Sequence, residues 1–250
     1  MQRYFVSDYD PENATVTITG DDVHHISRVM RMEAGDSIIC MVPEGHGAMC
    51  RIAEVKEDLV VAEIIEWLEE AKDLPVMITI AQGLPKGDKM ELVLQKGTEL
   101  GAFAFLPFQA DRSIVKWDYK KAEKKLSRYG KIVKEASEQS HRTSIPRIHQ
   151  VVNLVELLEL SKQYDHKIFA YEDEAKSDTF QRFGDVLNEV TIGQSVLVCF
   201  GPEGGFSERE VEMLRENGFL SVRLGPRILR AETAPLYLLS AVSYHFEEMR

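Results

Sequence analysis

The sequence predicts a protein of the α/β class, with a small N-terminal β-barrel followed by a larger α/β domain. Residues 1–70 contain short apolar strands separated by turn residues, which is typical of a small barrel. From Pro75 onward strands alternate with helices, which favours a mainly parallel sheet. The acidic run Glu69–Asp73 and the following Leu74-Pro75 mark the boundary. We therefore expect domains at 1–72 and 73–250.

The expected elements of the first domain are strands at 14–19, 37–42, 49–55 and 59–68, with one polar helical segment at 21–31. The segment ATVTIT alternates β-branched and small residues, as a half-buried strand does. The turn PEGHGA separates the second and third strands.

The second domain is expected to begin with a strand at 76–81, a helix at 89–100 ended by Gly101, and a strand at 102–108. A long helix over 119–140 and strands at 167–171 and 196–200 follow. The last of these strands is apolar throughout, which predicts a central position in the sheet. Ser207 and Glu210 form a capping box for a helix that stops at Gly218. A strand at 219–224 and a helix from Thr233, its expected cap, to Glu248 complete the domain.

The composition excludes several classes of protein. Apolar residues make up 44% and charged residues 28%, as in ordinary globular proteins. The longest stretch without charge, 233–246, is too short to span a membrane, and the N-terminus has no signal-peptide core. The three cysteines form no CxxC pair, and His24-His25 lacks partners at ligand spacing, so no metal site is expected. These features predict a cytoplasmic protein without membrane contact.

The charge is distributed unevenly along the chain. The formal net charge is −11, which by itself argues against nucleic-acid binding. Residues 1–72 carry a net charge of −9, whereas residues 112–147 hold 11 Lys and Arg against 4 Asp and Glu, a net charge of +7. A basic segment in an acidic chain favours an anionic partner.

The basic segment coincides with the predicted helix over 119–140. Small and apolar residues recur there at steps of three and four, which predicts one core-facing stripe: Ala122, Leu126, Tyr129, Val133, Ala136 and Ser140. Lysines and Arg128 occupy the remaining surface. Such a face neutralises phosphates, although a charged run is also typical of a simply solvated helix.

Two loops could bind a ligand. The glycine loop, Gly201-Pro-Glu-Gly-Gly-Phe-Ser207, joins the apolar strand to the capped helix, where backbone N–H groups can approach a ligand. The arginine loop, Leu224-Gly-Pro-Arg-Ile-Leu-Arg-Ala-Glu-Thr-Ala234, leaves the next strand and combines apolar residues with paired charges. Since open α/β sheets bind ligands at the carboxyl edge, we expect both loops at that edge. Neither loop matches a phosphate-binding Walker motif or a dinucleotide fingerprint, so a nucleotide hydrolase and an NAD enzyme are disfavoured.

The last predicted helix is apolar nearly all round, with eight apolar residues from Leu236 to Phe246. A helix of this kind must be buried on more than one side. It lies either wholly inside the domain or at a subunit interface.

Several motifs together resemble the bacterial 16S rRNA (uracil(1498)-N(3))-methyltransferase family, which belongs to the SPOUT class. In the second domain they are LPKGDKME (84–91), QKGTELG (95–101), ADRS (110–113), ASEQSHR with Pro146 (136–146), GPEGGFS (201–207) and LGPRILRAETA (224–234). The ordered pair of the last two is the most specific feature. RYFV (3–6), HHISRVMR (24–31) and EAGD (33–36) resemble the family's PUA-like RNA-binding barrel less distinctively.

The resemblance implies a PUA-like barrel and a SPOUT domain with a C-terminal trefoil knot. It also implies a homodimer through the C-terminal domain, with the site at the subunit interface. The implied cofactor is S-adenosyl-L-methionine (SAM), and the implied substrate is a uridine of 16S rRNA in the small ribosomal subunit. The residues implied to line the SAM pocket are Phe200, Gly201, Gly205, Leu224, Gly225, Ile228, Leu229 and Thr233.

The implied reaction needs a group that stabilises charge and a group that accepts a proton, because uracil N3 carries a proton at neutral pH. We assign the first role to Arg230 and the second to Glu232 or Glu138. The expected RNA-binding residues are Arg28, Arg31, Arg112, Lys120, Lys124, Lys131 and Arg142. The alternative from another class is a non-catalytic RNA-binding or ribosome-assembly factor, which would bind no SAM.

Overall fold

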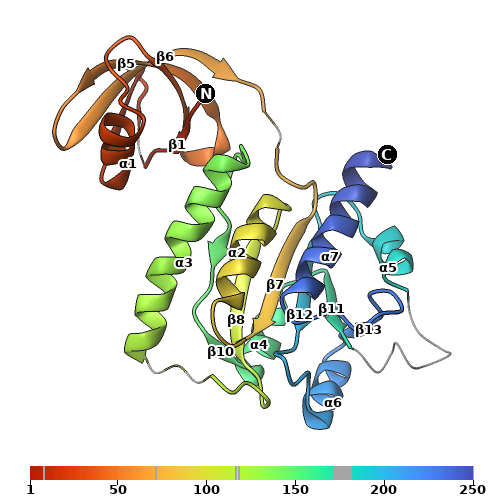
Figure 1. The fold of residues 1–250 in the computed structure, drawn as a ribbon. Coiled ribbons are helices and arrows are strands. Elements are labelled where there is room, and N and C mark those ends of the chain that lie inside the picture. Colours follow the sequence, from red (N-terminus) through yellow and green to blue (C-terminus); the bar gives the residue numbers. More distant parts are fainter. Residues whose placement is uncertain (8, 71, 116, 118, 172–181, 250) are drawn as a thin grey trace. The chain divides into compact units, whose positions relative to one another are not determined.

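The computed structural model describes residues 1–7, 9–70, 72–115, 117, 119–171 and 182–249. The chain divides into two compact units, drawn in Figure 1. The first unit comprises Met1–Asp73 together with Ser137–Ser144, and the second comprises Leu74–Ala136 and Ile145–Arg250. The sequence did not predict that residues 137–144 join the first unit.

The first unit is built on one curved six-stranded sheet. Its strand order is β1 (Arg3–Phe5), β4 (Ser37–Met41), β5 (Gly47–Val55), β6 (Leu59–Leu68), β3 (Thr15–Thr19) and β2 (Tyr9–Asp10). The β1–β4 pair is parallel and the other pairs are antiparallel. Alternating apolar residues of these strands, such as Val16, Ile18 and Ile52, form the core. The expected helical segment is α1 (Asp21–His24) continued by a π-helical turn, η1 (His25–Val29), and a 3₁₀ turn, η2 (Pro43–Gly45), lies within the predicted turn.

The second unit contains a parallel sheet. Its order is β10 (Val152–Asn153), β8 (Ala104–Gln109), β7 (Met77–Gly83), β12 (Ser195–Phe200), β11 (His166–Ala170) and β13 (Leu220–Val222), and β9 (Arg147–Ile148) also pairs with β8. Every pair is parallel. The interior position predicted for the apolar strand β12, between β7 and β11, is confirmed.

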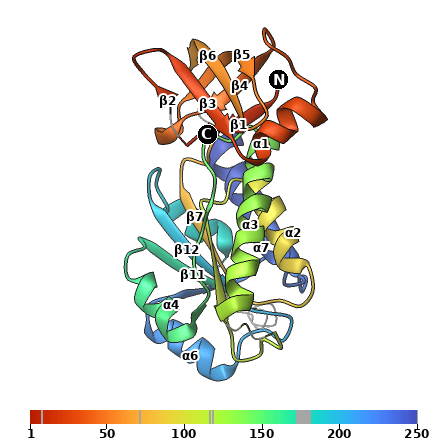
Figure 2. The same ribbon diagram turned by 90° about the vertical axis from the view of Figure 1, so that its left-hand side faces the viewer.

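Helices cover both faces of this sheet (Figure 2). α2 (Lys89–Glu99), α3 (Tyr119–Gln139), α5 (Phe183–Glu189) and α7 (Thr233–Ser243) contribute to one apolar core. α4 (Leu154–Ser161) and α6 (Glu208–Glu216) contribute to the core on the opposite face. This three-layer arrangement is the one that alternating strands and helices predict. No helix within the described part of the chain is long and apolar enough to cross a membrane.

Three details differ from the expectations. The helices α4 and α5 and the short strands β1, β2, β9 and β10 were not predicted. The expectation that Thr233 caps the last helix is wrong: Thr233 is its first residue, and Glu232 stands at the N-cap position without a side-chain hydrogen bond. The last helix also changes at Tyr244 into a π-helical turn, η4 (Tyr244–Glu248). Its Leu238, Leu239 and Val242 are buried, whereas Tyr237 and Tyr244 are exposed.

Candidate functional site

A cavity of about 390 Å³ opens at the carboxyl edge of β11, β12 and β13. Both loops singled out in the sequence contribute to its wall, together with residues that follow β11 and with Lys89 of α2. The lining residues are Lys89, Ala170, Tyr171, Phe200, Gly201, Pro202, Glu203, Gly205, Phe206, Val222, Arg223, Leu224, Gly225, Arg227, Ile228, Leu229, Arg230, Ala231 and Ala234. A cavity of this size fits an organic ligand of cofactor size.

The parallel sheet explains why the two loops meet. β11 pairs in parallel with β12 on one side and with β13 on the other, so all three strands end at the same edge. The expectation that the glycine loop and the arginine loop share the carboxyl edge is therefore confirmed. The sequence reasoning missed Ala170 and Tyr171, which end the intervening strand and complete the wall.

Two glycines allow the tight course of the glycine loop. Gly205 has a φ of 65°, in the left-handed region that glycine adopts without strain. A Cβ on Gly201 would lie 3.0 Å from the Cα of Gly205, so a side chain there would push the two halves of the loop apart. Gln82, at the end of β7, donates a hydrogen bond from Nε2 to the carbonyl oxygen of Gly201 at 3.2 Å. The backbone of the loop is thus compact and supported from the sheet.

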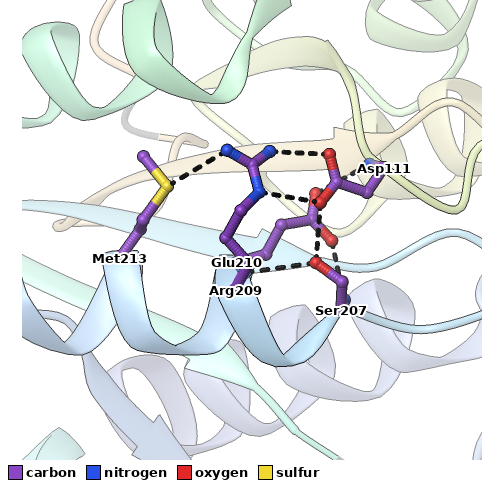
Figure 3. A network of polar contacts seen from close by, with 5 residues as sticks. All are labelled: Asp111, Ser207, Arg209, Glu210 and Met213. Atoms are coloured by element: carbon purple, nitrogen blue, oxygen red, sulfur yellow. Dashed lines mark hydrogen bonds and ion pairs between the residues drawn. The ribbon is translucent and has the colours of Figure 1, made fainter.

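A polar network holds the end of the glycine loop to the loop after β8 (Figure 3). Asp111 accepts hydrogen bonds from Arg209 Nη2 at 2.8 Å and from Ser207 Oγ at 2.7 Å. Glu210 accepts from the backbone N–H groups of Asp111 and Ser207, both at 2.8 Å. Ser207 Oγ in turn accepts from the Glu210 N–H, which confirms the predicted capping box.

The members of this network differ in exposure. The Glu210 side chain is completely buried, and its hydrogen bonds replace the water that a carboxylate requires. Asp111 and Arg209 are exposed. The hydrogen bond from Arg209, followed by the one from Ser207, lowers the pKa of Asp111, so its carboxylate stays ionised above moderately acidic pH.

Arg112, predicted to bind RNA, adds a further contact to the glycine loop. Its Nη1 donates a hydrogen bond to the carbonyl oxygen of Gly204 at 2.9 Å, while the side chain remains exposed. Glycine at position 204 allows the Arg112 side chain to approach the loop closely, because a Cβ at that position would lie 3.0 Å from the Cβ of Arg112. Arg112 therefore lies beside the pocket loop and still faces solvent.

The arginine loop forms fewer polar contacts with the described residues than the glycine loop does. Arg223 Nε donates to the carbonyl oxygen of Gly225 at 2.9 Å, and Gly225 has a φ of 77°. Ile228 is 69% exposed although it lines the cavity, so its side chain is open to solvent and is not part of the buried core. The Arg230 guanidinium is exposed and makes no hydrogen bond or ion pair with the described residues.

Lys89 connects the two loops. Its Nζ lies 2.9 Å from Glu203 Oε1 in the glycine loop and 3.3 Å from Glu232 Oε2 in the arginine loop. Partial burial acts to raise the pKa of Glu203, but the hydrogen bonds from Lys89 and from backbone N–H groups outweigh it and lower that pKa. The hydrogen bond to Glu203 raises the pKa of Lys89. Both groups are therefore charged at neutral pH.

The residues predicted to bind a cofactor lie together on the cavity wall, except Thr233. Phe200, Gly201, Gly205, Leu224, Gly225, Ile228 and Leu229 all line it. Thr233 is exposed at the start of α7, and its neighbour Ala234 lines the cavity instead. Among the described residues, no group of His, Cys, Asp or Glu side chains is arranged to hold a metal ion.

Two further predicted residues belong to the first unit. Glu138 accepts a hydrogen bond from the Phe5 N–H at 3.4 Å, and it is not among the residues that line the cavity. Arg142 is 3% exposed, and its Nε donates to Asp73 Oδ1 at 2.6 Å. A guanidinium that is buried and paired in this way helps to hold residues 137–144 in the first unit.

The other basic residues are on the surface. Lys120, Lys124 and Lys131 are exposed on α3, and the first two have no partner within the described ranges. Arg28 and Arg31 are exposed in the first unit, where they flank the exposed Val29 and Met30. The predicted core stripe of α3 is confirmed by the burial of its central residues, Tyr129, Val133 and Ala136.

Comparison with known proteins gives a consistent result. A family model described as an RNA methyltransferase domain matches residues 72–243, and one described as an RNA methyltransferase PUA domain matches residues 18–65. The chain is 49% identical to ribosomal RNA small subunit methyltransferase E of Bacillus subtilis, covering 100% of this chain and 99% of that protein. It is 34% identical to the protein of that name in Aquifex aeolicus, covering 88% and 90% of the two chains.

A solved structure extends the similarity to the fold. The ribosomal RNA small subunit methyltransferase E of Neisseria gonorrhoeae, crystallised with SAM bound, superposes with a TM-score of 0.87 at 30% identity, covering 98% of each chain. With matching folds, a matching family model over most of the chain and nearly half of all residues shared with one relative, this chain belongs to the ribosomal RNA small subunit methyltransferase E family.

Proposed function

We propose that this protein is a SAM-dependent methyltransferase that methylates N3 of a specific uridine in 16S rRNA of the small ribosomal subunit. The observation that carries the proposal is the cavity between the glycine loop and the arginine loop. Its position at the carboxyl edge of a parallel sheet is where such folds bind ligands. Full-length similarity to rRNA methyltransferases supports the choice of substrate.

The residues of the cavity fit SAM. Phe200, Leu224, Ile228 and Leu229 offer apolar surface for an adenine ring. The loop around Gly201 leaves no room for a side chain, so backbone groups can approach a ligand closely. When bound, SAM supplies an electrophilic methyl group on a positively charged sulfur.

The remaining chemistry is assigned to residues of this chain. Uracil N3 becomes a nucleophile only after losing its proton, and the negative charge then spreads to the neighbouring carbonyl oxygens. Arg230 lines the cavity, and its guanidinium is exposed and unpaired with any residue that the structure describes, so it can stabilise that charge. Glu232, two residues further along the same loop, is the proposed acceptor of the N3 proton, directly or through a water.

The structure favours Glu232 over Glu138 as the proton acceptor. Glu232 is held beside the cavity by Lys89, whereas Glu138 is engaged within the first unit. The Nζ of Lys89 lies 3.3 Å from Glu232 Oε2, which fixes the position of this carboxylate at the edge of the cavity.

We assign RNA binding to exposed basic residues of both units. Lys120, Lys124 and Lys131 on α3 would neutralise phosphates, and Arg112 would bind phosphate or base next to the glycine loop. Arg28 and Arg31 would contribute from residues 1–72, which we propose act as a PUA-like RNA-binding barrel; the match to the PUA model supports this.

Three further properties are part of the proposal. We propose that residues 73–250 form a SPOUT domain with a trefoil knot, that the protein acts in the cytoplasm where ribosomes are assembled, and that it forms a homodimer through the C-terminal domain. The exposed aromatic side chains of Tyr237 and Tyr244 on the last helix support the dimer, since apolar patches mark interaction sites. Sedimentation equilibrium of the parent protein tests it.

The decisive experiment incubates the protein with labelled SAM and small ribosomal subunits or rRNA that lack the modification, followed by nucleoside analysis. We expect label in 3-methyluridine. Calorimetry with SAM alone separates the catalytic proposal from a non-catalytic RNA-binding or assembly factor, because that alternative predicts no heat of binding. The proposal would be contradicted if the protein bound RNA but did not bind SAM and transferred no labelled methyl group.

A further inference from the structure

Three segments of the second unit meet at one ammonium group. Lys89 is the first residue of α2, Glu203 lies in the glycine loop, and Glu232 lies in the arginine loop. The Nζ of Lys89 is within 3.3 Å of an oxygen from each carboxylate. Lys86 of the preceding turn also donates its backbone N–H to Glu203 Oε1 at 3.1 Å. The segment before α2 thereby connects the two walls of the cavity.

The buried carboxylate of Glu232 depends on the ammonium of Lys89 for charge compensation. Its side chain is only 13% exposed, and Oε2 is buried without a hydrogen bond from any described residue. A buried carboxylate oxygen is costly unless a positive charge compensates it. Lys89 supplies that charge, while its second contact holds Glu203, whose side chain is 30% exposed. Without the ammonium, two carboxylates that share one binding partner would face each other and repel.

The other charged residues that the structure describes around the cavity do not compensate the charges of Glu203 and Glu232. Arg227 and Arg230 line it but form no ion pair with the described residues, and Arg223 Nε is engaged by the carbonyl oxygen of Gly225. Glu91, the next acidic residue of α2, is paired with Lys125 and Arg128 of α3. Among the described residues at the cavity, Glu203 and Glu232 are therefore the two carboxylates that share the Lys89 ammonium.

We propose that Lys89 is a positioning residue that holds Glu203 and Glu232 together and so sets the spacing of the two loops that receive SAM. This inference rests on the proposed function, because it takes SAM as the ligand of the cavity. It assigns to the conspicuous segment LPKGDKME a role in closing the pocket. The lysine acts through the two loops, and no contact with the reacting atoms is required.

The test measures SAM affinity by calorimetry for the parent protein, for Lys89→Met and for the control Lys96→Met. Lys96 lies on the same helix and pairs only locally, with Glu99 at 2.7 Å. At pH 8 we expect Lys89→Met to weaken SAM binding by about fivefold, because a partly exposed ion pair is worth up to roughly that factor. Lys96→Met should bind SAM as the parent does. Thermal melting checks that each variant is folded.

Two measurements separate charge compensation from the packing of the lysine chain. Lowering the pH from 8 to 5 should restore most of the affinity of Lys89→Met, because repulsion raises the pKa of one carboxylate until it takes up a proton. Glu203→Gln combined with Lys89→Met should restore affinity at pH 8, and Glu203→Gln alone completes the double-mutant cycle. Loss of packing around the lysine stem would be insensitive to both changes.

The outcomes distinguish a failure of the proposed function from a failure of the role assigned to Lys89. If the parent protein binds no SAM, the proposed function fails and this inference fails with it. If the parent binds SAM and Lys89→Met binds it equally well at pH 8, only the role of Lys89 is contradicted. A loss of affinity that neither mild acid nor Glu203→Gln reverses also contradicts it, whereas recovery in both tests supports it.

Discussion

The two loops of the pocket are built in different ways. The glycine loop is fixed by the buried Glu210 and by the Asp111–Arg209 contact (Figure 3). Gln82 of β7 adds a hydrogen bond to the carbonyl oxygen of Gly201. The arginine loop carries exposed side chains, among them Ile228 and Arg230. Its contact with the rest of the site runs through Glu232 and Lys89.

This difference in how the loops are held suits them to different ligands. A loop whose polar groups are already satisfied can bind a cofactor with little loss of conformational freedom. A loop with exposed charged and apolar side chains can order itself around a second ligand, at an entropic cost paid when that ligand binds. We infer that changes in the glycine-loop network will chiefly affect stability and SAM affinity, and that removing the exposed Arg230 guanidinium of the arginine loop will chiefly affect methyl transfer.

The largest effect is expected for Arg230→Ala. Removing a group that stabilises developing charge typically lowers kcat by about 10²–10³-fold. SAM affinity should change by less than about threefold, because the guanidinium supports the loop through no contact with the described part of the chain. Single-turnover methylation of unmodified small-subunit RNA measures the rate, and calorimetry measures SAM binding. Methylation at the parent rate would remove Arg230 from the mechanism.

The glycine-loop network is tested by Glu210→Ala. This change removes a fully buried carboxylate and leaves the partly buried N–H groups of Asp111 and Ser207 without their acceptor, which should lower the free energy of unfolding by about 1–3 kcal/mol. Urea denaturation measures that loss. Glu208→Ala is the matched control, since Glu208 is an exposed residue of the same helical turn and should change stability by less than about 0.5 kcal/mol. Equal effects of the two variants would contradict the assigned role of Glu210.

Gly201→Ala addresses the backbone of the same loop. The added Cβ would lie 3.0 Å from the Cα of Gly205, so the loop must shift, at a cost of roughly 1–2 kcal/mol in SAM binding. That cost corresponds to a five- to thirtyfold weaker affinity by calorimetry. Gly130→Ala, in the open surface of α3, should instead stabilise the fold by about 0.5–1 kcal/mol and leave SAM binding unchanged. Unaltered affinity in Gly201→Ala would show that the loop tolerates a side chain.

Local sequence patterns predicted the regular elements well where the pattern was strong. The bounds expected for β6, 59–68, agree with the structure at both ends, and the helix expected at 89–100 is α2, Lys89–Glu99. α4 was missed although Asn153 and Glu156 form a capping box, because its eight residues are too short for a clear helical period. The strands β9 and β10 have two residues each, which is too few for any alternation to appear.

The site was predictable where it depends on loops that follow consecutive strands, and not where it depends on distant pairing. The lining positions of the two loops follow from the parallel sheet. The contact between Asp111 and Arg209 joins residues 98 positions apart, and Lys89 meets Glu203 and Glu232 from a different element. Nearness in sequence also misled: Arg142 follows the basic helix, but it is buried against Asp73. Such pairings arise only once the whole chain is folded.

The smallest effect concerns the exposed edge of the glycine-loop network. Asp111→Asn removes the ion pair with Arg209, which is exposed and so is worth only about 0.5 kcal/mol. Because the pKa of Asp111 is lower in the folded protein than in the unfolded chain, its contribution is present above about pH 4 and is lost as the pH falls through the folded value. The difference in Tm between parent and variant should therefore be constant from pH 8 to pH 5 and shrink below pH 4. A difference that shows no decline down to the lowest pH at which the parent stays folded would show that Asp111 stabilises the loop as a neutral hydrogen-bonding group. The preorganisation of this loop would then rest on Glu210 rather than on the ion pair.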